Sequence, residues 1–149
     1  MMLVRWFCVS SSLILCFTGI AKILSAFGHV QVLAVPDPIF GLQFNHLMLL
    51  VGTIELAVAW VCFSKRQAHF SVIIVAWLAT SMLFYRYGLW MMGWRRPCSC
   101  LGNFTDAIHI SPHAADNSMK VALGYLLIGS YAALIWFARR RGAATSIRE

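Results

Sequence analysis

Charged residues are scarce in this chain, and acidic residues are the scarcest of them. Only 11% of the 149 residues are charged, with 5 Asp or Glu against 12 Lys or Arg. A soluble globular domain carries about a quarter charged residues, so this composition excludes an ordinary soluble domain. The net charge of +7 does not indicate nucleic-acid binding, because no basic cluster is interleaved with soluble aromatic platforms. The sequence also lacks internal repeats and low-complexity segments.

Hydrophobic residues are abundant, at 60%, and they gather in long runs. The runs cover residues 6–24, 44–63, 70–92 and 119–138. About 20 apolar residues cross the hydrocarbon core of a bilayer, so each run has the length of one transmembrane helix. We interpret the first run as a retained helix rather than a signal peptide, because it is long and no small-residue cleavage site ends it. The sequence therefore predicts an all-α, four-helix transmembrane bundle, a single integral membrane domain over residues 1–149.

Lys and Arg residues are unevenly distributed between the two ends of these runs. If the crossings alternate, one side receives most of the cations: Arg5, Lys65, Arg66, Arg139, Arg140, Arg141 and Arg148. The other side receives Arg95, Arg96 and Lys120. Because cytoplasmic segments carry the excess of Lys and Arg, both termini are expected in the cytoplasm. The loop of residues 93–118 is then expected on the periplasmic face of a bacterial inner membrane, an oxidising compartment.

That loop contains the most distinctive segment of the chain, Arg95-Arg96-Pro97-Cys98-Ser99-Cys100-Leu101-Gly102. A disulfide between Cys98 and Cys100 closes a very small ring, so it restricts the unfolded chain little and is a poor structural staple. Strain in such a ring makes the bond easy to reduce, and Arg95 and Arg96 favour the thiolate. The pattern predicts a redox pair. Two free or separately paired loop cysteines are the alternative.

A metal site is a competing interpretation of the same loop. Two histidines follow the cysteines with the spacing His-x3-His. Zinc or copper could be held by two thiolates and two imidazoles, those of Cys98, Cys100, His109 and His113. Pro112 argues against this site, because a proline interrupts the helix that would present both imidazoles on one face.

Three charged residues lie within the hydrophobic runs: Lys22, Glu55 and Arg86. Each costs a few kcal/mol near the bilayer centre unless it is paired or hydrated. One interpretation is a polar pocket beneath the cysteine loop that holds a quinone head group or relays protons. The other is a structural ion pair of Glu55 with Lys22 or with Arg86. Gly52 and Ala59, on either side of Glu55, would let a neighbouring helix approach closely.

An ordered set of short motifs connects these features. The motifs are Gly19-x-x-Lys22, Asp37-Pro38, Gly52-x-x-Glu55 and Cys98-x-Cys100-x-Gly102. In this order, over residues 13–137, the chain resembles the DoxX-like superfamily and, within it, the MauE-type redox-associated membrane proteins. The resemblance implies that Cys98 and Cys100 exchange electrons with a thioredoxin-like partner and a membrane acceptor such as a quinone. It also implies that Lys22 and Glu55 are pocket residues.

The sequence therefore predicts a membrane-embedded thiol–disulfide redox protein, which passes electrons between an extracytoplasmic thiol protein and an acceptor in the lipid bilayer. Whether such a carrier is itself an oxidoreductase enzyme is left open. Two further functions are compatible with the same features. The chain could be a non-catalytic transmembrane subunit that stabilises a larger membrane complex, or a metal-binding module that uses the Cys-x-Cys loop.

Overall fold

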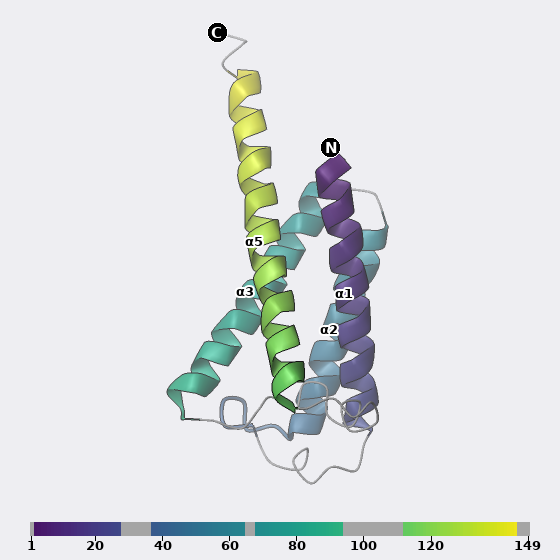
Figure 1. Ribbon diagram of the computed structural model, residues 1–149, viewed down its shortest axis with the longest axis vertical. Helices are drawn as coiled ribbons and strands as arrows, with labels where there is room; N and C mark the ends of the chain where they lie inside the picture. The colour runs from purple at the N-terminus through teal and green to yellow at the C-terminus, as the bar shows by residue number, and fades with distance from the viewer. Residues whose placement is uncertain (1, 28–36, 65–67, 94–111, 146–149) are drawn as a thin grey trace.

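The computed structural model describes residues 2–27, 37–64, 68–93 and 112–145. These segments form the helices α1 (Met2–Ala26), α2 (Phe44–Phe63), α3 (Ala68–Met91) and α5 (Pro112–Thr145) (Figure 1). Each helix is long and apolar enough to cross a membrane, and no β-strand occurs in the described segments. The prediction of an all-α protein with four transmembrane helices is confirmed.

The helices run alternately in opposite directions, so the two termini lie at the same end of the bundle (Figure 1). The most extensive contacts join α1 to α2, followed by those that join α3 to α5. Away from the termini, α3 inclines outward from the α1–α2 pair (Figure 1). The packing of α3 against the α1–α2 pair therefore loosens toward the end where α3 finishes. That the shared end of the termini faces the cytoplasm remains a prediction.

The last helix is longer at both ends than the hydrophobic run of residues 119–138 predicts. It begins at Pro112, where a proline is well tolerated, because the first N–H groups of a helix have no intrahelical partner. It continues past the run to Thr145. Hydrophobicity marks only the part of a helix that lies in hydrocarbon, whereas the backbone hydrogen bonds can continue into the aqueous region. Pro112 thus starts a helix here and does not interrupt one.

Helices α1 and α2 approach each other closely where Gly19 faces Gly52. A Cβ atom added at Gly52 would lie 2.9 Å from Ile23 Cγ1 and 3.0 Å from the Gly19 carbonyl oxygen. Small residues let two membrane helices approach this closely. Further along the seam, the Ser12 hydroxyl donates to the carbonyl of buried Ala59 at 2.9 Å. The close approach predicted at Gly52 and Ala59 is confirmed.

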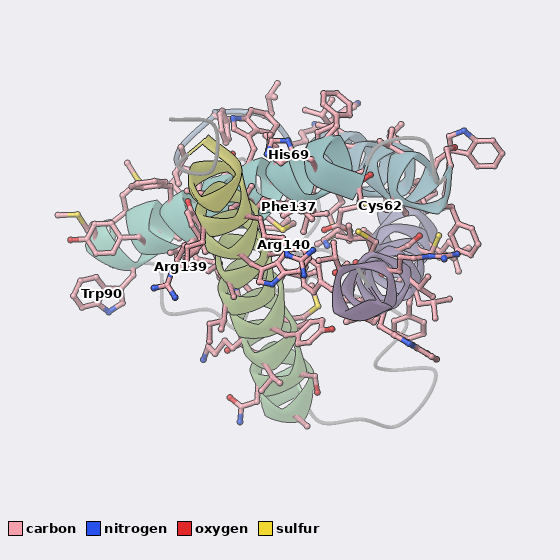
Figure 2. All side chains as sticks on the ribbon, turned by 90° about the horizontal axis from the view of Figure 1, so that it is seen from above. Cys62, His69, Trp90, Phe137, Arg139 and Arg140 are labelled. Carbon is pink, nitrogen blue, oxygen red and sulfur yellow. The ribbon has the colours of Figure 1, made fainter. Side chains whose placement is uncertain are left out.

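Large apolar side chains cover the outer surface of the helices. Those that are more than half exposed include Trp6, Phe17, Trp60, Trp77, Phe84 and Ile128. Only 11% of the most hydrophobic window of α5 is buried. Seen from the end that carries the termini, Trp90 projects away from the other helices (Figure 2). A contiguous apolar surface of this extent marks a membrane interaction, which identifies the chain as an integral membrane protein.

Substitution of Gly52 by alanine should lower the thermal stability of the detergent-solubilised protein. The added methyl group would meet the backbone of Gly19, which can yield only if α1 and α2 separate, and overpacking of this kind costs about 1–3 kcal/mol.

Gly124→Ala is the matched control, because, apart from the backbone of its own helix, no atom of the described segments lies within 4 Å of the Cβ position at Gly124. Alanine also favours a helix over glycine by about 1 kcal/mol. Heat unfolding of the two variants should therefore give opposite shifts. A Gly52→Ala variant as stable as Gly124→Ala would contradict the close crossing.

Candidate functional site

The structure describes part of the site that the sequence predicts. The loop residues outside the described segments are Arg95, Arg96, Cys98, Cys100 and His109. His113 belongs to the first turn of α5, but its side chain lies outside the described atoms. The three charged residues of the hydrophobic runs are all described, and each has an ionic partner.

Lys22 of α1 and Glu55 of α2 form an ion pair beside the glycine crossing. Lys22 Nζ donates to Glu55 Oε1 at 2.6 Å. The two side chains are only 4% and 2% exposed. Gly52 leaves room for the Lys22 stem, since a Cβ atom at Gly52 would lie 3.4 Å from Lys22 Cβ. Of the two partners considered for Glu55, the structure shows Lys22. Because the Lys22 side chain is buried, it does not extend outward to the lipid head groups.

Some hydrogen-bonding groups of the Lys22–Glu55 pair have no partner among the described residues. Glu55 Oε2 is buried, and no described residue donates a hydrogen bond to it. Thr18 contributes a hydroxyl beside the Glu55 carboxylate, but that hydroxyl donates to the Leu15 carbonyl at 3.3 Å. Of the three N–H groups of Lys22, one donates to Glu55. An unsatisfied buried acceptor costs about 1–3 kcal/mol, so its presence calls for an explanation.

Arg86, the third charged residue of the hydrophobic runs, pairs with Asp116 of α5. Arg86 Nη2 lies 3.1 Å from Asp116 Oδ1, and Lys120 Nζ lies 2.6 Å from Asp116 Oδ2. One carboxylate thus ties α3 to α5. Sequence reasoning missed Asp116 because it placed this residue in the loop of residues 93–118. The earlier start of α5 is what brings the carboxylate opposite Arg86.

Asp37 is a second residue whose role the sequence did not reveal, and it is only 1% exposed. Its Oδ1 accepts the N–H groups of Ile39 and Phe40 at 2.8 and 2.9 Å, which forms an Asx turn before α2. Its Oδ2 accepts a hydrogen bond from the Tyr85 hydroxyl of α3. The Asp-Pro-x-x-Gly order signals the turn, but it carries no information about a partner 48 residues away.

A cavity of about 250 Å³ lies between α2, α3 and the first turns of α5. Its wall is mostly apolar and includes Met119 and Leu123 of α5. Three other lining residues, Leu50, Ile54 and Trp77, are 55%, 37% and 67% exposed. Because these three also belong to the lipid-facing surface, the cavity opens sideways toward the bilayer between α2 and α3.

Four polar side chains complete the wall of the cavity: Lys22, Ser81, Tyr85 and Arg86. Ser81 donates to a backbone carbonyl of its own helix. The other three are each bound to a carboxylate, in the pairs Lys22–Glu55, Tyr85–Asp37 and Arg86–Asp116. Tyr85 has no second O–H to donate, whereas the two cations keep further N–H groups. This arrangement can hold a lipid-soluble molecule with few polar atoms.

Cysteines inside the helices behave as small hydrophobic residues. Cys8, Cys16 and Cys62 carry free thiols, and Cys8 and Cys62 are buried in hydrophobic clusters. Within the described segments, no group of three or more His, Cys, Asp or Glu residues could hold a metal ion. The alternative metal site predicted from the loop uses the side chains of Cys98, Cys100, His109 and His113, which lie outside the described atoms.

Comparison of the chain with known protein families, with characterised proteins and with solved structures finds no match in any of the three.

Single and double substitutions should show whether Lys22 and Glu55 stabilise the protein as a pair. Lys22→Met or Glu55→Leu alone should each lower the stability by about 3–5 kcal/mol, because the remaining charge is left buried without a partner. The double variant K22M/E55L replaces both charges by apolar side chains of similar length, and it should recover most of the loss.

Heat unfolding and the monodisperse fraction after solubilisation measure these effects. Lys120→Met serves as the control, because this side chain is 60% exposed and an exposed ion pair contributes little. If the double variant were no more stable than either single variant, the two residues would not be acting as a pair.

Proposed function

We propose that the protein is a membrane-embedded thiol–disulfide oxidoreductase. In this proposal, Cys98 and Cys100 pass electrons to a lipid-soluble acceptor, such as a quinone, that is bound in the cavity. The observation that carries the proposal is the cavity itself: it is apolar, it opens to the bilayer, and it lies at the end of the bundle to which the Cys-x-Cys segment is joined.

The chain connects the cysteines directly to two walls of the cavity. Helix α3 ends at Met91, and α5 begins at Pro112. Cys98 and Cys100 follow Met91 by seven and nine residues in the sequence. The C-terminal half of α3 contributes lining side chains as far as Arg86, and α5 contributes Met119 and Leu123. The segment that carries the thiol pair is therefore joined in the sequence to two helices that line the cavity.

The size of the cavity fits a single ring with substituents. An apolar cavity of about 150 Å³ in another protein is large enough to bind benzene. The cavity here measures about 250 Å³, which leaves room for ring substituents or for the start of a tail. The opening between α2 and α3 would let a long apolar chain remain in the bilayer. A quinone has this shape and is itself dissolved in the membrane.

The proposed reaction is balanced in electrons and protons. Oxidation of two thiols breaks two S–H bonds, forms one S–S bond and releases two electrons and two protons. Reduction of a quinone to a quinol takes up the same number of each. A thioredoxin-like protein outside the membrane would then reduce the disulfide by thiol–disulfide exchange. Arg95 and Arg96 assist because nearby cations favour the thiolate, which is the reactive form.

Differential alkylation tests whether the two loop thiols cycle. Membranes are treated with an oxidant or a reductant, labelled with a thiol reagent and mapped by mass spectrometry. Cys98 and Cys100 should gain and lose label together, because each needs the other to form the disulfide. Buried Cys8 and Cys62 should remain unchanged.

Cys98→Ser should leave Cys100 reduced under both conditions, whereas the matched control Cys16→Ser should leave the cycle intact. Equal labelling of Cys98 and Cys100 with and without oxidant would rule out the proposed function.

A further inference from the structure

We infer that the Lys22–Glu55 pair binds the polar end of the molecule that enters the cavity, with Lys22 donating to a ring carbonyl and Glu55 accepting from a ring hydroxyl. This inference rests on the proposed function. It adds the two side chains that recognise the oxidised and the reduced forms of a lipid-soluble quinone.

A stripe of α2 that lines the cavity leads toward Glu55, which does not itself line the cavity but is bound to the lining residue Lys22. Phe44, Met48 and Val51 all line the cavity. Their spacing of four and then three residues puts them on one face of the helix. Glu55 follows Val51 by four residues and continues this face by one more turn. Its partner Lys22 is the residue that α1 contributes to the cavity wall.

The Lys22–Glu55 pair is buried and also has hydrogen-bonding groups without a partner among the described residues. Glu55 Oε2 is buried and receives no hydrogen bond from the described residues. Lys22 Nζ donates to Glu55 and has further N–H groups to offer. The Arg86–Asp116 pair differs, because its side chains are 23% and 19% exposed and Lys120 binds the second oxygen of Asp116. A ligand with both an acceptor and a donor would give hydrogen-bond partners to Lys22 Nζ and to Glu55 Oε2.

The two redox forms of a quinone meet these two requirements in turn. The ring carbonyl of the oxidised form accepts an N–H from Lys22. After reduction by two electrons the same oxygen carries a proton, one of the two released by the thiols, and it donates this O–H to Glu55 Oε2. Lys22 remains a cation and Glu55 an anion throughout, so the charge of the pair does not change.

Binding of decylubiquinone, a benzoquinone with a ten-carbon chain, tests this inference. The purified protein in detergent is titrated with the quinone, and quenching of tryptophan fluorescence reports binding, since Trp77 lines the cavity. The K22M/E55L variant should bind at least tenfold more weakly than the unmodified protein. Lys120→Met, which does not touch the cavity, should bind normally. If K22M/E55L unfolds as the unmodified protein does and binds decylubiquinone equally well, the pair is a structural lock and the inference is wrong.

Photolabelling of the unmodified protein gives a second test that does not depend on how any variant folds. An azido derivative of decylubiquinone should label the α1 segment around Lys22 and the α2 segment around Val51. Labelling confined to other segments would overturn the inference.

The experiments distinguish a failure of the redox function from a failure of the ligand site. If Cys98 and Cys100 prove inert while decylubiquinone binding depends on Lys22 and Glu55, the redox function is wrong and the ligand site stands. If the cysteines cycle but decylubiquinone does not bind, the ligand site is wrong and the thiol chemistry stands.

Discussion

The hydrocarbon core of the bilayer offers a buried charge no water, and this constraint explains the Lys22–Glu55 pair at the centre of the bundle. Each charge is tolerable in hydrocarbon only because the other is 2.6 Å away. That distance in turn requires α1 and α2 to approach at Gly19 and Gly52, where neither helix carries a side chain. The ion pair and the glycine crossing therefore depend on each other and together define the α1–α2 unit.

The cavity follows from how the remaining helices are attached to this unit. Asp116 joins α5 to Arg86 of α3, and Asp37 joins the turn before α2 to Tyr85 of α3. Each carboxylate binds one polar side chain of the cavity wall, Arg86 or Tyr85, and the rest of the wall is mostly apolar. A space of this kind, open to the lipid between α2 and α3, suits a ligand that already resides in the membrane.

Sequence reasoning predicted the four crossings because long hydrophobic runs determine them independently of tertiary contacts. It also identified Lys22 and Glu55, since a charge within such a run is conspicuous. It left the partner of Glu55 open, because pairing across 33 residues depends on where the helices cross. It did not identify Asp116, because hydrophobicity gave no sign that α5 starts at Pro112. The sequence indicated a polar pocket beneath the cysteine loop, but it could not reveal a mostly apolar wall that opens between α2 and α3, since this depends on the inclination of α3 relative to α2. The redox role of Cys98 and Cys100 remains a prediction from the sequence.

We propose that electrons pass from the loop thiols to a quinone held within the bundle. Single-turnover reduction in liposomes measures this transfer directly. The protein is reconstituted with decylubiquinone, its loop thiols are reduced from outside with an impermeant reductant, the excess reductant is removed, and quinol formation is followed together with the redox state of the cysteines. One quinol should form for each disulfide, and none should form in the Cys100→Ser variant. Formation of the disulfide without any quinol, or of quinol in the variant, would contradict the proposed transfer.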